Sequence, residues 1–150
     1  MFKISTGLRN ELLGTNCLSS LLSGLNSEIR IYAGTEPASA DDSLGSATLL
    51  CKITPNGILP TQRLTFNLSP VGGILQKNSN EVWKGTNLAS GSATFYRWID
   101  SADSGGLSTT AIRLQGSVGV VNADLLLAST TLVASQEQRI DYFAIGMPGS

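Results

Sequence analysis

The strongest constraint on the fold is the stretch of residues 93–148, which consists of short alternating segments separated by turn-rich joints. Within it, segment 112–115 alternates apolar with polar residues, the period of two that is typical of a β-strand with one buried face. Segment 95–99 instead carries bulky side chains on both faces. We therefore expect that strand to lie between two layers of the protein or at a contact between subunits.

The N-terminal segment predicts one helix from about residue 6 to residue 24. Ser5 or Thr6 can cap its start, and Gly24 and Asn26 mark its end. Its apolar side chains recur at helical spacing, namely Leu8, Leu12, Leu13, Leu18, Leu21, Leu22 and Leu25. These leucines cover more than half of the helix circumference. We expect the helix to pack in the core of its own domain or to present part of its apolar face to another subunit.

The segments after this helix alternate in the manner of strands. The predicted strands are residues 28–33, 47–54, 63–68 and, as a short edge strand, 81–84. In the most regular of them, Leu64, Phe66 and Leu68 are expected to face the core. A loop containing Pro37 and a strong turn signal at residues 55–57 separate these strands. The sequence therefore predicts a mainly β fold with a single domain, in which one N-terminal α-helix precedes a β-sandwich or jelly-roll-like body over residues 28–148.

The composition is typical of a protein that stays in contact with other protein subunits. Only 14% of the 150 residues are charged, whereas about a quarter is usual for a free domain. With a net charge of −1 and no block of Lys and Arg, nothing indicates direct binding to nucleic acid. No apolar run approaches the roughly 20 residues that cross a bilayer, and the first residues do not resemble a signal peptide.

A search for catalytic or metal-binding motifs identifies no candidate residue. The chain has no His, which removes His-dependent triads, His-ligated metals and the commonest acid–base group. Phosphate-binding loops and nucleophile elbows are also absent from the sequence. The pairs Asp41–Asp42 and Asp100–Asp103 are interpreted as turn residues rather than cation sites, although two carboxylates for glycoside cleavage stay formally possible. We predict no catalytic, cofactor-binding or metal-binding residue and no enzyme activity.

The two cysteines, Cys17 and Cys51, lack metal-ligand spacing. Both stand in apolar surroundings in the sequence, so buried free thiols are the favoured interpretation. A disulfide between them remains an alternative.

Aromatic residues gather in the second half of the chain, namely Trp83, Tyr96, Trp98, Tyr142 and Phe143. Such a group can form a platform for sugar binding, but a buried core or a subunit interface is its commoner fate. Arg97, between Tyr96 and Trp98, is of the residue type that anchors interfaces.

Four stretches of the sequence resemble a known group of proteins. They are residues 5–10 at the start of the leucine-rich helix, residues 29–41, residues 96–102, and residues 113–119 continuing to 123–125. Together they resemble small structural proteins encoded by tailed bacteriophages. The resemblance covers most of the chain, and its motifs are turns and strands rather than catalytic signatures. It implies a component of the virion.

The function expected from this resemblance is that of a capsid decoration, or cement, protein. Such a protein is made in the host cytoplasm, lies on the capsid surface, binds the major capsid protein and forms a homodimer or homotrimer. The expected contact residues are Leu8, Arg9 and Leu12 on the helix, Glu36 and Pro37 in the following loop, and Tyr96, Arg97 and Trp98. Two alternatives stay open: a tail, baseplate or head–tail joining component, and a carbohydrate-binding module.

Overall fold

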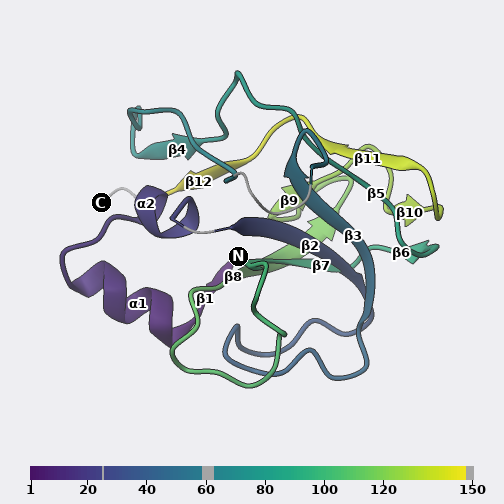
Figure 1. The fold of residues 1–150 in the computed structure, drawn as a ribbon, viewed down its shortest axis with the longest axis horizontal. Helices are drawn as coiled ribbons and strands as arrows, with labels where there is room; N and C mark the ends of the chain where they lie inside the picture. The colour runs from purple at the N-terminus through teal and green to yellow at the C-terminus, as the bar shows by residue number, and fades with distance from the viewer. Residues whose placement is uncertain (25, 59–62, 148–150) are drawn as a thin grey trace.

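The fold is built on one large, mainly antiparallel sheet. A computed structural model describes residues 1–24, 26–58 and 63–147 (Figure 1). The sheet runs in the order β1 (Lys3–Ile4), β8 (Leu114–Gly119), β7 (Phe95–Asp100), β2 (Ser27–Ala33), β3 (Thr48–Pro55), β5 (Trp83–Thr86) and β11 (Glu137–Ile140). An eighth strand, β9 (Leu125–Leu126), pairs in parallel with β8. The predicted mainly β class is confirmed.

Two further sheets contain two short strands each. One pairs β4 (Ile74–Gln76) with β12 (Ala144–Gly146), and the other pairs β6 (Gly91–Ser92) with β10 (Thr131–Leu132). The second layer over the core is therefore made of short strands and loops rather than of a second large sheet.

The N-terminal helix is shorter than predicted and is broken. α1 spans Thr6–Leu13 and α2 spans Leu18–Leu22, so the single helix over residues 6–24 is wrong. Gly14 ends α1 by leaving the helical conformation while its N–H still bonds to the Glu11 carbonyl. The break separates the leucines, since Leu8 and Leu22 are buried whereas Leu13 is exposed. Leu25, which the same pattern included, lies outside the described residues, as does the end of the predicted body at residue 148.

The hydrophobic core lies on one face of the large sheet. Trp98 of β7 stacks on Phe66, with ring centroids 5.1 Å apart, and meets Trp83 of β5 edge-on at 5.3 Å. Phe143, just before β12, contacts both tryptophans and Tyr96. These aromatic contacts join the sheet to the short strands that cover it.

The predicted strand over residues 63–68 does not form. Leu64 and Phe66 are buried as expected, but Leu68 is fully exposed, with a relative accessibility of 103%. The segment makes a single β-bridge, from Phe66 to Lys77, and the chain then bends before Pro70. Alternation alone predicted a regular strand here, although no strand among the described residues supplies a full ladder of hydrogen bonds.

The strand predicted at residues 81–84 begins at Trp83 and is not an edge strand, because β5 pairs with both β3 and β11. Gly85 lets β5 approach β3 closely, since a Cβ at this position would collide with the Lys52 carbonyl. The predicted turn after β3 is confirmed: Asn56 and Gly57 both have positive φ, at 57° and 70°.

The other face of the large sheet is covered where it is formed by β1, β8, β7 and β2. Two long loops cover it, residues 34–47 between β2 and β3 and residues 101–113 between β7 and β8. Strand β7 therefore lies between two layers, and five of its six residues are buried. Arg113 and Gln115 were expected on a solvent-facing side, but both are buried because these loops lie over them.

Candidate functional site

A row of basic and polar side chains crosses the loop-covered face of the sheet. The strand register places Lys52 opposite Arg30, Arg30 opposite Arg97, Arg97 opposite Gln115, and Gln115 opposite Lys3. Residues directly opposite each other share a face of the sheet, so these five side chains lie on the same face. Lys3, Gln115, Arg97 and Arg30 hydrogen-bond to the covering loops, whereas Lys52 is partly exposed and lies 3.8 Å from Glu28. The row therefore binds the two loops from four neighbouring strands, β1, β8, β7 and β2.

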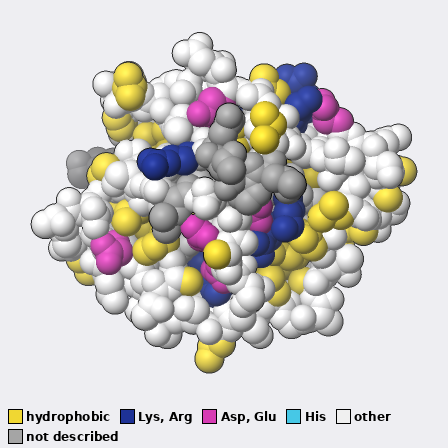
Figure 2. Space-filling model, in the orientation of Figure 1, with side chains coloured by type: hydrophobic (Ala, Val, Ile, Leu, Met, Phe, Trp, Pro, Cys, Tyr) yellow, Lys and Arg dark blue, Asp and Glu magenta, His cyan; other side chains and the backbone are white. Residues whose placement is uncertain are grey.

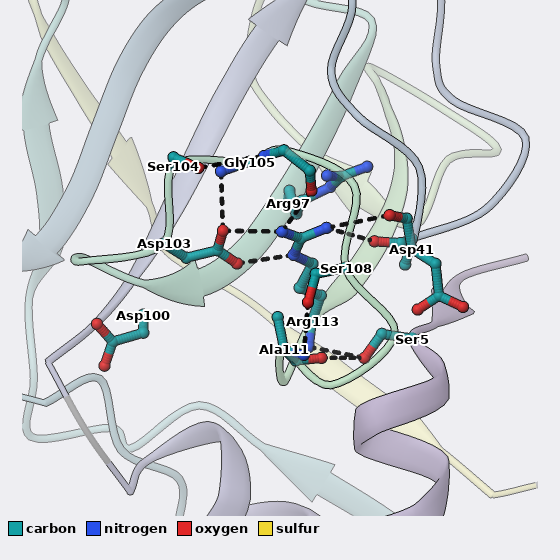
Figure 3. Close-up of polar contacts among 12 residues, drawn as sticks. Ser5, Asp41, Arg97, Asp100, Asp103, Ser104, Gly105, Ser108, Ala111 and Arg113 are labelled. Atoms are coloured by element: carbon teal, nitrogen blue, oxygen red, sulfur yellow. Dashed lines mark hydrogen bonds and ion pairs between the residues drawn. The ribbon is translucent and has the colours of Figure 1, made fainter.

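Arg113, next to this row, makes the densest set of contacts (Figure 3). Its Nε lies 2.7 Å from Asp103 Oδ2 and its Nη2 lies 2.8 Å from Asp103 Oδ1, a two-point ion pair. The same guanidinium donates to the carbonyl oxygens of Gly106, at 2.8 Å, and of Ala40, at 3.1 Å. One buried side chain thus holds both covering loops.

Arg97 is fully buried and donates to neutral oxygens. Its Nε lies 3.0 Å from Gln115 Oε1, Nη2 donates to the same oxygen, and Nη1 lies 3.0 Å from the Asp42 carbonyl. Burial, followed by the nearby positive charge of Arg113, lowers the pKa of Arg97 to about 10. The guanidinium therefore stays protonated at neutral pH, and its charge is balanced by dipoles and by more distant carboxylates.

Arg30 anchors the turn after β7. Its Nη1 and Nη2 donate to the carbonyl oxygens of Asp103, at 2.8 Å, and of Ser101, at 2.9 Å, while Nε pairs with Glu28. Each of the three arginines thus donates to loop carbonyl oxygens, which would otherwise need water. We refer to Arg30, Arg97, Arg113, Asp103 and Gln115 as the arginine network.

The start of α1 is tied to the same loops. Ser5 caps the helix by accepting from the Leu8 N–H at 3.1 Å, and its hydroxyl donates to the Ala111 carbonyl at 2.7 Å (Figure 3). Asp41, in the other loop, accepts from both the N–H and the hydroxyl of Thr6. The predicted Ser5 cap is confirmed, whereas Asp41, expected to close a local turn, binds the helix instead.

The predicted contact residues on the helix and in the loop differ in exposure. Leu8 is buried, Leu12 is half-buried against the core, and Arg9 is exposed. Glu36 and Pro37 are half-buried and fixed: Lys3 Nζ lies 2.8 Å from Glu36 Oε1, and the Pro37 carbonyl accepts from Lys3 and Gln115. Of these five residues, Arg9 offers the most accessible side chain.

The remaining predicted contact residues are interior. Tyr96, Arg97 and Trp98 are at most 1% exposed. Trp98 and Tyr96 belong to the core, and Arg97 belongs to the arginine network. In this fold they have no surface to offer a partner, because strand β7 is covered on both faces.

The exposed apolar side chains lie elsewhere, and the sequence analysis missed them. Val71, Ile74 and Met147 are exposed around the β4–β12 pair, and Figure 2 shows hydrophobic side chains at the upper left, where Figure 1 places β4. An apolar groove of about 200 Å³, lined by Leu18, Pro70, Leu75 and Ile145, lies beside them. We call Val71, Ile74 and Met147 the β4–β12 patch. The sequence did contain a signal for their exposure: Val71 and Ile74 flank two turn glycines, Gly72 and Gly73, and turns lie at the surface.

The two thiols differ in exposure to solvent, and the expectation that both are buried is wrong for Cys17. Cys17 is exposed at the start of α2, and hydrogen bonds with Ser19 and then Ser20 lower its pKa to about 7. Cys51 is buried in β3, and burial raises its pKa to about 12. Both are free thiols.

The described ranges 1–24, 26–58 and 63–147 contain neither a metal-binding cluster nor a membrane-spanning helix. Within them, His, Cys, Asp and Glu form no group of three or more that could hold a metal ion. No helix in those ranges is long and apolar enough to cross a membrane.

Comparison of the chain with known protein families, curated proteins and solved structures finds no match.

Proposed function

We propose that the chain is a structural protein of a tailed-bacteriophage virion. In this role it decorates the capsid: it binds the assembled head and stabilises contacts between major capsid protein subunits. The four sequence stretches that resemble phage structural proteins support the first part of the proposal. They supply Ser5, Arg30, Asp41, Arg97 and Arg113, which meet in and around the arginine network. The resemblance thus falls on residues that hold this fold together.

The distribution of charged and apolar side chains on the surface supports a role in binding another protein. Three of the ten Lys and Arg residues are buried in the arginine network. The surface is therefore even poorer in charge than the composition indicates, and it carries exposed apolar side chains such as those of the β4–β12 patch. Apolar patches of this kind mark interaction sites on soluble proteins.

The β4–β12 patch is the best candidate for the contact with the head. Its three side chains surround the end of a short two-stranded sheet, next to the groove of about 200 Å³. An apolar side chain of a capsid subunit fits a groove with such lining, and burying Val71 and Met147 adds roughly 1.5–3 kcal/mol each.

The fold also suits the mechanism. A protein that binds only the assembled shell stabilises that shell by mass action, and many copies multiply a modest contact. Backbone hydrogen bonds between Val71 and Ile74 and from the Met147 N–H to the Gly73 carbonyl hold the β4–β12 patch in place, so little conformational entropy is lost when the patch is covered.

The test is the composition and strength of particles produced with and without the gene for this chain. We expect the chain in purified heads in many copies, a regular set of surface features that disappears with the gene, and heads that burst at a lower temperature without it. Adding purified chain to depleted heads should restore both properties.

A matched pair of variants tests the contact surface. Val71→Asp combined with Ile74→Asp should abolish binding to depleted heads, whereas Leu107→Asp, at an exposed leucine outside the patch, should leave it intact. Chain found only in tails, in few copies, would contradict decoration and favour the tail or head–tail alternative.

The structure does not present the aromatic surface that the carbohydrate-binding alternative requires. Of the five aromatic residues that suggested it, only Tyr142 is exposed, and Trp83, Tyr96, Trp98 and Phe143 are buried. A lone ring offers little area for stacking on a sugar, so a screen of soluble glycans should show no binding.

A further inference from the structure

Strand β11 ends the large sheet. Among the strands that the structure describes, β11 pairs with β5 on one side only. The opposite end of the sheet is β1, which has two residues against the four of β11. An unpaired edge of this length is a template for another strand.

The hydrogen bonds around Asn87 show which backbone groups face outward. The Asn87 N–H donates to the Gln136 carbonyl at 2.8 Å, and the Asn87 carbonyl accepts from the Ser135 N–H at 2.9 Å. The Gln136 carbonyl therefore points toward the chain that follows β5, whereas the Gln136 N–H donates to the Val133 carbonyl in the preceding turn. Since successive residues of a strand alternate in this direction, Gln138 and Ile140 also face β5, and the N–H and C=O groups of Glu137 and Arg139 point away from the sheet. The Arg139 carbonyl accepts from Gln138 Nε2 at 3.0 Å, a contact with an exposed side chain that a pairing strand can replace.

This outward edge borders an open groove of about 520 Å³. Its lining includes residues 136–139 and Tyr142 on one side and residues 126–129 and 131–133 on the other. The lining mixes apolar side chains with polar and backbone groups, which is the character of sites where an extended strand is added to a sheet.

We propose that the partner of this edge is a second copy of the same chain. The two β11 strands pair antiparallel about a two-fold axis at Gln138, so Glu137 of each copy lies opposite Arg139 of the other. The interface is isologous and contains two equivalent ion pairs. Directly opposed residues have Cβ atoms about 5 Å apart, and opposite charges there are favourable.

The charges also select this register. If the axis passed through Glu137, two glutamates would oppose each other, and if it passed through Arg139, two arginines would. Both alternatives bring like charges together across the pair. The register centred on Gln138 is the arrangement of these three that places opposite charges together while the outward backbone groups of both strands meet.

Apolar side chains at the ends of the edge support the same pairing. Tyr142, which is 65% exposed, follows β11, and Val133, which is 47% exposed, precedes it. Antiparallel pairing brings the Tyr142 end of one copy beside the Val133 end of the other, so both side chains lose contact with water.

Charge-reversed variants of the purified chain provide the test, read by sedimentation velocity over a range of concentrations. We expect the unaltered chain to form a dimer. Glu137→Arg alone and Arg139→Glu alone should each weaken the dimer by on the order of tenfold in Kd, because each creates two like-charge contacts. An equimolar mixture of the two variants should form a mixed dimer, and the double variant E137R/R139E should recover self-association.

Lys84→Gln is the matched control. It removes the ion pair within one chain between Lys84 Nζ and Glu137 Oε2, at 2.7 Å, but leaves the outer edge unchanged. It should dimerise like the parent. Thermal unfolding of each variant checks that these substitutions on a short surface strand leave the chain folded.

A parent chain that stays monomeric at every concentration would overturn the proposal, as would a dimer that both single variants leave unchanged. A monomer whose β11 edge is occupied by a different protein would overturn it too. The experiment needs no virion, so its failure is distinct from failure of the proposed head-binding function, which particle composition measures.

Discussion

Arg113 and Asp103 form a buried two-point ion pair, with Nε–Oδ2 and Nη2–Oδ1 distances of 2.7 and 2.8 Å. The pair closes the loop of residues 101–113 on itself, and the further bond from Arg113 to the Ala40 carbonyl attaches the other loop. Arg113 therefore contacts both covering loops, which Arg30 and Arg97 also help to hold.

Arg113→Met should destabilise the fold by about 3–5 kcal/mol, because it leaves Asp103 without its partner in a largely buried place. The free energy of unfolding in urea measures this loss. The double variant R113M/D103L should recover part of the stability, since no uncompensated charge is left. Arg63→Met, at an exposed arginine, should change stability by no more than about 0.5 kcal/mol. An equal effect of R113M and R63M would contradict the structural role of the pair.

Stability should fall in acid, in part through Asp103. Burial raises the pKa of Asp103, but the hydrogen bonds from Arg113 and from the Gly105 N–H outweigh it, so the pKa lies below its ordinary value of 3.8. A carboxylate with a lowered folded-state pKa stabilises the fold above the unfolded-state pKa, and this contribution is lost as the pH falls through the folded-state value.

Asp103→Asn should therefore flatten the dependence of unfolding free energy on pH below about pH 4, while lowering stability at neutral pH. Urea titrations between about pH 6 and pH 3 measure the slope. Asp141→Asn, at an exposed carboxylate, is the control and should leave the slope close to that of the parent. An unchanged slope in D103N would show that this carboxylate is not linked to folding.

Gly7→Ala should destabilise the chain, because a Cβ at Gly7 would collide with the backbone of Thr110 and Ala111 where α1 meets the loop. Overpacking against backbone costs about 1–3 kcal/mol. Gly146→Ala in β12 is a matched control, since nothing lies within 4 Å of the added Cβ. Thermal unfolding should show a lower Tm for G7A alone. Similar Tm values for both variants would mean that α1 does not pack as described.

The two cysteines should react at very different rates with a thiol-alkylating reagent. Cys17 is exposed and has a pKa of about 7, so its rate of alkylation should rise through neutral pH. Cys51, buried and with a pKa of about 12, should react only when the chain unfolds. Mass spectrometry should count one label on the native chain and none on C17S. Two labels on the native chain at similar rates would contradict the burial of Cys51.

Local patterns predicted much of this fold. Ser5 as a helix cap, the turn at Asn56 and Gly57, and the strands around Ile29 and Tyr96 follow from interactions between residues close in sequence. The same patterns failed where a partner element was needed. Residues 63–68 alternate as a strand does, yet no neighbouring strand completes a ladder with them.

The sequence by itself determined that the chain is mainly β, because alternation and turn residues act over a few positions. The tertiary structure decided what covers each face of the sheet. In the sequence, Arg113 stands on the polar side of an alternating strand and Arg97 is of the type that anchors interfaces, but loops from distant parts of the chain bury both and supply carbonyl and carboxylate oxygens. A period of two distinguishes the faces of a strand, whereas the burial of each face depends on contacts between residues far apart in the chain.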